Sequence, residues 1–144
     1  MSRSRVLLAD DHPAVLDQVE RLLAEDAEVV GKFCDGQALL DAVAVSAPDL
    51  LIIDISMPRV DGLEVTRRLR ASGLRVPIVF LTVHDDPDFV RAAFDAGGNG
   101  YVVKSRLASD LLTCIEEVTA GHRFVSPTAA LGADPPPTLP ECQF

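Results

Sequence analysis

Short apolar runs alternate along the chain with longer stretches in which apolar residues recur every three or four positions. The short runs are bounded by charged residues, glycine or proline, as is typical of strands, whereas the longer spacing predicts amphipathic helices. Apolar runs that do not alternate with polar residues indicate strands buried on both faces of a sheet. Five strands are predicted in this way, at residues 5–10, 27–34, 48–54, 76–82 and 100–104.

A helix is predicted after each strand, at residues 13–25, 35–46, 63–72, 87–97 and 108–121. Pro13 suits a first helical turn, Asp35 a helix N-cap and Gly73 a position just after a helix. Five consecutive strand–helix units with right-handed crossovers predict an α/β fold. We expect a doubly wound, five-stranded parallel sheet of the flavodoxin-like order 2-1-3-4-5, covered by five helices.

The periodic pattern stops at Gly121, and the last 23 residues carry five prolines, three of them consecutive. We therefore predict one domain over residues 1–121 and a Pro-rich linker or tail over 122–144. Phe124 and Val125 are the apolar residues through which the start of this tail could dock on the domain.

The composition narrows the classes of partner. The formal charge of −9 gives the chain no general attraction for nucleic acid or anionic membranes, and no apolar run has the length of a membrane span. The three cysteines, Cys34, Cys114 and Cys142, are widely spaced, which is typical of a reduced, cytoplasmic protein. We expect no DNA binding by this chain itself, because too few residues follow the predicted domain for a helical DNA-binding unit. Whether such a unit follows in a longer natural protein is left open.

Polar residues stand at the ends of four predicted strands. The first ends in Asp10 and Asp11, the third in Asp54, the fourth in Thr82 and the fifth in Lys104. In an open parallel sheet these side chains meet at one edge, where clustered carboxylates repel one another unless a cation lies between them. Mg²⁺ suits oxygen ligands, and a carboxylate can attack phosphorus to give an acyl phosphate. The set predicts phosphoryl transfer onto Asp54, with Lys104 and Thr82 binding phosphate oxygens.

The same residues form a spaced signature. It consists of "DD" at 10–11, Asp54 followed by "MP" at 57–58 and "DG" at 61–62, "LT" at 81–82, and "GYVVK" at 100–104. Over about residues 3–121 the chain resembles the receiver domain of two-component response regulators. The stretch "LTVHDDPDFVRAAFDAGGNGYVVKS" and the later "GHRFVSP" are most similar to receivers of regulators with LuxR-type helix-turn-helix output domains.

This resemblance implies a role for each matching residue. Asp54 is the expected acceptor of a phosphoryl group from a sensor histidine kinase or a phosphotransfer protein. Asp11 is expected to ligate Mg²⁺ directly and Asp10 through water, with Asp54 and the main-chain carbonyl of Ser56 as further ligands. Lys104 is expected to hold the phosphoryl group.

Thr82 and Tyr101 are implied to be a switch pair, in which the threonine hydroxyl moves toward the phosphoryl group and the tyrosine ring follows inward. The surface formed by the fourth and fifth helices and the fifth strand is then expected to change its protein contacts, including formation of a homodimer. The expected chemistry is self-catalysed phosphotransfer and dephosphorylation, not turnover of an external substrate.

Other interpretations use the same residues. Asp10 and Asp11 could cap the helix that begins at Pro13, and Tyr101 could be a packing residue. A phosphate-independent protein-binding module of the same fold is the main alternative. A flavodoxin or an aspartate-nucleophile hydrolase is disfavoured, because no phosphate loop occurs and "DIS" at 54–56 has no second aspartate. Ser56, Val83 and His84 flank the site, and from them we predict a phosphoryl lifetime longer than minutes.

Overall fold

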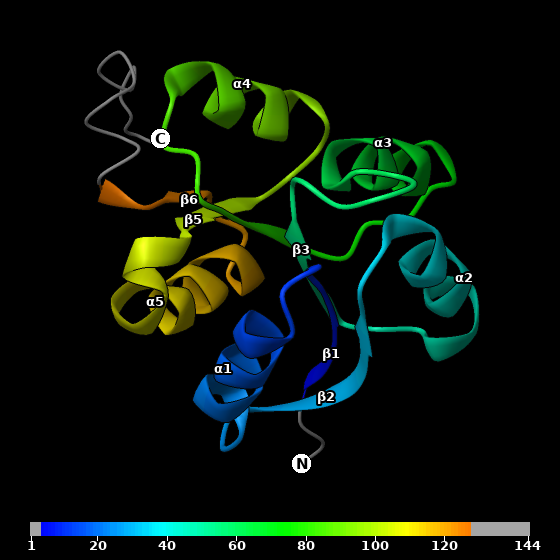
Figure 1. Ribbon diagram of the computed structural model, residues 1–144, viewed down its shortest axis with the longest axis horizontal. Helices are drawn as coiled ribbons and strands as arrows, with labels where there is room; N and C mark the ends of the chain where they lie inside the picture. The colour runs from blue at the N-terminus through cyan, green and yellow to red at the C-terminus, as the bar shows by residue number, and fades with distance from the viewer. Residues whose placement is uncertain (1–3, 128–144) are drawn as a thin grey trace.

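The computed structural model describes residues 4–127 and consists of a parallel sheet with helices on both faces (Figure 1). The strands are β1 (Ser4–Ala9), β2 (Ala27–Phe33), β3 (Leu50–Asp54), β4 (Ile78–Thr82), β5 (Gly100–Val103) and β6 (Phe124–Val125). The helices are α1 (Pro13–Leu23), α2 (Gly36–Ser46), α3 (Gly62–Ala71), α4 (Pro87–Asp95) and α5 (Leu107–Thr119), with a 3₁₀ turn η1 (Lys104–Arg106) before α5.

The sheet has the order β2-β1-β3-β4-β5-β6, and every strand pair in it is parallel. The predicted fold class, the order of the first five strands and the five helices are confirmed. The predicted number of strands is too small by one, because Phe124 and Val125 add the short strand β6 beside β5. These two residues dock as expected, although a two-residue strand leaves no periodic pattern in the sequence.

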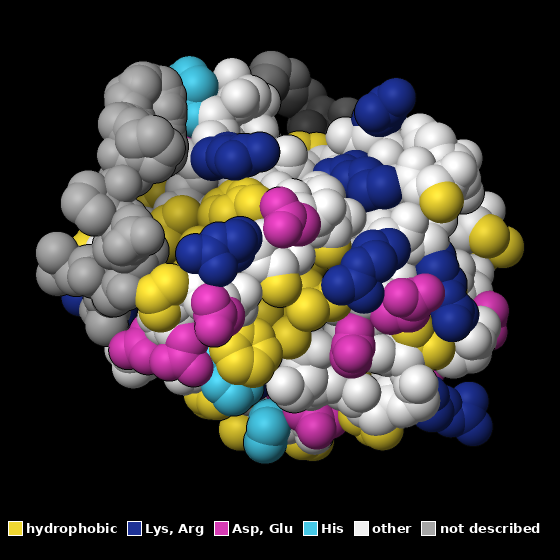
Figure 2. All heavy atoms as spheres, turned by 90° about the horizontal axis from the view of Figure 1, so that it is seen from above, with side chains coloured by type: hydrophobic (Ala, Val, Ile, Leu, Met, Phe, Trp, Pro, Cys, Tyr) yellow, Lys and Arg dark blue, Asp and Glu magenta, His cyan; other side chains and the backbone are white. Residues whose placement is uncertain are grey.

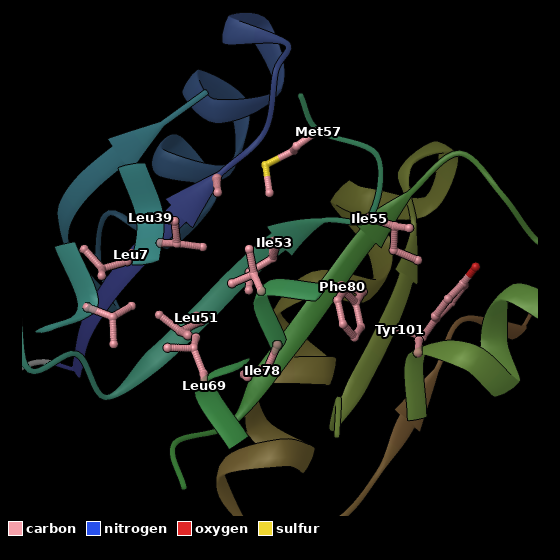
Figure 3. Packing of buried hydrophobic residues seen from close by; sticks show 14 of the residues in the cluster. Leu7, Leu39, Leu51, Ile53, Ile55, Met57, Leu69, Ile78, Phe80 and Tyr101 are labelled. Atoms are coloured by element: carbon pink, nitrogen blue, oxygen red, sulfur yellow. The ribbon is translucent and has the colours of Figure 1, made fainter. Parts of the chain in front are cut away.

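Two apolar cores lie on opposite faces of the sheet. Side chains of β1, β3, β4 and β5 pack against α2, α3 and α4 on one face, where Figure 3 shows Leu39 and Leu69 near the strand residues. On the other face, alternate residues of the same strands pack against α1 and α5. The central strands β3 and β4 are buried over their whole length, and their polar residues, Asp54 and Thr82, stand at their carboxyl ends.

Local sequence signals explain where the helices begin and end. Pro13 occupies the first turn of α1, and the Asp35 side chain accepts a hydrogen bond of 2.8 Å from Ala38 N at the start of α2. Gly73 follows α3 with φ +96°, a left-handed conformation that favours glycine. The N-cap of α1 is His12, whose side chain makes no capping hydrogen bond, while Asp10 Oδ1 accepts a hydrogen bond of 2.8 Å from the His12 N–H just before the helix.

Arg70 fastens α3 to the loops that precede β4 and β5. Its guanidinium donates to four acceptors in two other segments: Leu74 O, Val76 O, Gly97 O and the Asn99 side chain, at 2.8–3.0 Å.

On the face that carries α3 and α4, basic and acidic side chains alternate around apolar atoms (Figure 2). Among the helices that the structure describes, none is long and apolar enough to cross a membrane.

Candidate functional site

The register of the sheet brings the predicted site residues together. Ala9 pairs with Ile53, so that Asp10 and Asp54 follow side by side. Thr82 pairs with Val103, so that Lys104, the next residue, lies just beyond Thr82 at the end of β5. Four residues from positions 10 to 104 of the chain thus meet at the carboxyl edge of the sheet.

Lys104 bridges two buried carboxylates. Its Nζ lies 2.8 Å from Asp10 Oδ2 and 3.3 Å from Asp54 Oδ2. The side chains of Asp10 and Asp54 are only 1% and 5% exposed, whereas that of Lys104 is 12% exposed. The Asp10 contact is an ion pair without hydrogen-bond geometry, so Asp10 Oδ2 is a buried oxygen that lacks a hydrogen-bond donor. One ammonium group therefore compensates two carboxylates, which leaves a local excess of negative charge.

The surroundings of Asp54 disfavour its charged form. Burial, followed by repulsion from Asp10, raises the pKa of Asp54 from 3.8 to about 6. Lys104 and a hydrogen bond of 3.2 Å from Ser56 N to Asp54 Oδ1 act in the opposite direction. Asp54 is therefore mostly ionised at pH 7, but its charge is not fully compensated by protein groups.

A cation would fit beside these carboxylates. Asp10, Asp11, His12 and Asp54 each offer one ligand atom, and the four atoms lie within 4.8 Å of one another. The donor-free Asp10 Oδ2 and the uncompensated charge of Asp54 are what a hard, oxygen-seeking ion such as Mg²⁺ would satisfy. The residues present therefore fit a divalent cation. The contribution of the Ser56 carbonyl stays a prediction.

Two dipeptides of the sequence signature, "MP" at 57–58 and "DG" at 61–62, shape the loop after Asp54. Met57 of the "MP" pair is buried among the apolar residues next to α3, and Figure 3 shows it at the end of that cluster. Asp61 caps α3, since its Oδ1 accepts a hydrogen bond of 2.8 Å from Glu64 N. Gly62 packs so closely on the main chain of Asp54 that an added Cβ would collide with the Asp54 carbonyl oxygen. These contacts hold the start of α3 against the end of β3.

His84 connects the two predicted switch residues through its main chain. Its N–H donates to Thr82 Oγ1 at 3.1 Å, and its carbonyl oxygen accepts a hydrogen bond of 2.8 Å from the Tyr101 hydroxyl. Its ring stacks on that of Phe89 in α4, with centroids 4.0 Å apart and planes 2° from parallel. Tyr101 is fully buried beyond Phe80 (Figure 3), and burial raises the pKa of its hydroxyl. Thr82, Tyr101 and α4 are thus in contact through one residue.

The sequence prediction set His84 beside the site but missed its main-chain link between Thr82 and Tyr101, and it missed the contacts of His12. His12 Nδ1 lies 3.1 Å from Asp10 Oδ1 and 3.0 Å from Asp11 Oδ1. Its position directly after the two aspartates was the signal that could have placed it at the site. No comparable signal exists for His84, because its hydrogen bonds use peptide groups that are common to all residues except proline.

Comparisons with known proteins agree with this geometry. Residues 6–116 match the family model described as the response regulator receiver domain. Response regulator GacA of Pseudomonas aeruginosa is 34% identical over 128 residues, which are 88% of this chain and 60% of that protein. Transcriptional regulatory protein PdtaR of Mycobacterium tuberculosis is 40% identical over 123 residues, which are 85% of this chain and 60% of that protein. The chain thus spans about three fifths of the length of these relatives.

Solved structures show the same fold. A LuxR-family two-component response regulator from an Aurantimonas species superposes with a TM-score of 0.85 at 33% identity, covering 91% of this chain and 95% of that chain. The isolated REC domain of RcsB from Salmonella enterica serovar Typhimurium, determined in the presence of the phosphomimetic BeF₃⁻, gives a TM-score of 0.85 at 27% identity. That likeness covers 92% of this chain and all of that domain. Both the family match and the strand-end geometry lead to one conclusion: the chain belongs to the response regulator receiver domain family.

Proposed function

We propose that this chain is a phosphorylation-dependent signalling switch that accepts a phosphoryl group onto Asp54. The donor is a sensor histidine kinase or a phosphotransfer protein, and the reaction requires Mg²⁺. The observation that carries this proposal is the buried pair of Asp10 and Asp54 bridged by Lys104, in which the pKa of Asp54 is raised to about 6. A carboxylate in this state is mostly ionised at neutral pH, so it can act as a nucleophile, and it gains stabilisation when a cation binds beside it.

The reaction forms one bond and breaks one. An oxygen of Asp54 attacks the phosphorus of a phosphohistidine, an O–P bond forms, the N–P bond breaks, and its electron pair returns to the imidazole. Lys104, whose Nζ lies 3.3 Å from Asp54 Oδ2, is proposed to donate to a phosphoryl oxygen, as is Thr82 at the end of the neighbouring strand. Asp10, Asp11, Asp54 and the Ser56 carbonyl would hold Mg²⁺, which supplies neutralisation of the developing negative charge when bound. Apart from this self-catalysed transfer and its hydrolysis, we propose no catalytic activity.

The signal is proposed to leave the site through Thr82, His84 and Tyr101. The Tyr101 ring is already buried, with its hydroxyl held by the His84 carbonyl. This is the inward arrangement expected for the phosphorylated state, so a second arrangement with the ring displaced is expected to prevail without phosphate. Protein contacts on the face of α4, β5 and α5, including a homodimer, are the proposed output.

A phosphomimetic titration tests the proposal. With Mg²⁺ and beryllofluoride, the amide resonances around residues 54–57, 82–84 and 101–104 should shift in the wild-type chain and stay unmoved in Asp54→Asn. An exposed-site variant, Asp41→Asn on α2, serves as the control and should respond like the wild type. Absence of a wild-type response would refute the switch and favour the phosphate-independent binding module.

The phosphoryl lifetime is a separate expectation. Val83, whose side chain is exposed beside the site, and His84 and Ser56 are proposed to restrict the approach of a hydrolytic water. Acetyl phosphate labelling followed by removal of the reagent should give an aspartyl phosphate that persists for longer than minutes. Decay within seconds would contradict this expectation without affecting the assignment of Asp54.

A further inference from the structure

The chain turns back onto the sheet after α5. Residues 122–127, which we call the exit segment, follow Gly121 at φ +92° and lie along the outer edge of β5, between α4 and α5 (Figure 1). Phe124 N donates to Asn99 O at 3.2 Å, and Ser126 N donates to Tyr101 O at 2.8 Å. The exit segment thus occupies the middle of the surface on which the switch is expected to act.

Ser126 is the anchor of the exit segment. It is fully buried, its Oγ accepts a hydrogen bond of 3.0 Å from Val103 N, and it donates one of 2.8 Å to Asp110 Oδ2. Asp110, only 5% exposed, is held in turn by Arg106, whose Nε and Nη2 donate at 2.8 and 3.1 Å. A buried carboxylate satisfied in this way fixes the serine far more firmly than two strand residues alone would.

The attachment points of the exit segment flank the site. Its two partners on β5 are the main chain of Tyr101 and that of Val103, the residue directly before Lys104. A third contact reaches α4, where the Arg123 guanidinium lies 5.0 Å from the centre of the Phe94 ring. The segment is therefore in contact with α4, β5 and α5 together, and two of its hydrogen bonds use groups whose positions depend on β5.

We infer that the exit segment is a latch on β5, whose docking is coupled to the inward position of Tyr101 and so to the state of Asp54. This inference rests on the proposed function. When the Tyr101 ring is buried, the backbone of β5 is fixed, and both the acceptor at Tyr101 and the donor at Val103 are in place for Ser126. Displacement of the ring loosens the same backbone and weakens both hydrogen bonds. Phosphorylation, which favours the inward ring, therefore tightens the latch.

Such a coupling is reciprocal. If an occupied site strengthens docking of the exit segment by some factor, a loosened segment must weaken occupation of the site by the same factor. Couplings of this kind are commonly about fivefold or more. The variant Ser126→Ala removes the anchor, and Arg123→Ala removes the contact with α4 while leaving the buried residues intact. Thr119→Ala, an exposed hydroxyl that bonds to carbonyls of its own helix, is the matched control.

Hydrogen exchange and a beryllofluoride titration, both with Mg²⁺, test the latch. In the wild type, beryllofluoride should slow exchange of the Val103 and Ser126 amides by at least about fivefold. The titration midpoint should rise by a comparable factor in Ser126→Ala, by less in Arg123→Ala, and not at all in Thr119→Ala. Circular dichroism confirms that each variant is folded, and Arg123→Ala carries the test if Ser126→Ala is not.

The outcomes separate the two proposals. The latch is overturned, and the switch left standing, in either of two cases. In the first, beryllofluoride changes amide exchange around Asp54 but not at residues 122–127. In the second, the midpoint of the beryllofluoride titration is unchanged in both Ser126→Ala and Arg123→Ala. No change around Asp54 in the wild type overturns the switch itself, and the latch with it.

Discussion

Asp54 is expected to destabilise the fold when it is ionised. Its side chain is nearly buried, and Lys104 is shared with Asp10, so the native state disfavours the charge. The variant Asp54→Asn keeps the shape of the side chain and removes this charge. Lys104 retains its ion pair with Asp10 at 2.8 Å, so that no buried ammonium group is left without a partner.

The size of the effect follows from the raised pKa. A pKa of about 6 in the folded chain, against 3.8 for the ordinary group, corresponds to about 3 kcal/mol of lost stability at pH 7, since a tenfold change in proton affinity is worth about 1.4 kcal/mol. The folded chain binds the proton more tightly, so stability falls as the pH rises from about 4 to about 6 and stays low above that window. Asp54→Asn should escape this loss.

Urea unfolding in the presence of a metal chelator measures it. We expect Asp54→Asn to exceed the wild type by about 3 kcal/mol at pH 7.5 and by about 1 kcal/mol at pH 4.5, as the linkage relation gives. Asp41→Asn, the same change at an exposed position, should show no such dependence. A variant no more stable than the wild type at pH 7.5, or a difference independent of pH, would show that Lys104 compensates both carboxylates and refute the reasoning.

Three further changes have expected outcomes. Tyr101→Phe removes the donor to the His84 carbonyl and should cost about 1 kcal/mol in urea unfolding while retaining the buried ring; an unchanged stability would mean that water replaces the hydroxyl. Gly62→Ala places a methyl group against the Asp54 carbonyl and should cost about 1–3 kcal/mol and weaken beryllofluoride binding, a result that a purely local strain at α3 would not give. Arg70→Ala removes four hydrogen bonds and should lower the stability by about 2–4 kcal/mol, whereas Arg68→Ala, an exposed arginine of the same helix, should change it by less than about 1 kcal/mol.

The sequence was sufficient for the first five strands and for the positions of the strand-end residues because both depend on one regularity. An uninterrupted apolar run ends where the strand leaves the core, so the first polar residue after each run lies at the carboxyl edge. Asp10, Asp54, Thr82 and Lys104 all follow from this rule, and the register then sets Asp10 and Asp54 around one ammonium group.

Features that depend on main-chain groups or on pairs of residues distant in the chain could not be predicted from the sequence. The link from Thr82 to Tyr101 runs through the peptide groups of His84, which carry no residue-specific signal. The bond between Ser126 and Asp110 joins two common polar residues that sit 16 positions apart. This hydrogen bond forms only because the chain turns at Gly121 and pairs with β5 through β6. A strand of two residues is too short to show a periodic pattern of apolar residues.

The link at position 84 separates what must be kept from what can be altered. Both hydrogen bonds at this position belong to the peptide backbone, while the side chain alone meets Phe89 on α4. Any amino acid except proline would preserve the connection between the threonine and tyrosine hydroxyls. The stacking on α4 could meanwhile be strengthened, weakened or removed. Substitution at position 84 would therefore change the contact with α4 while both main-chain hydrogen bonds are kept.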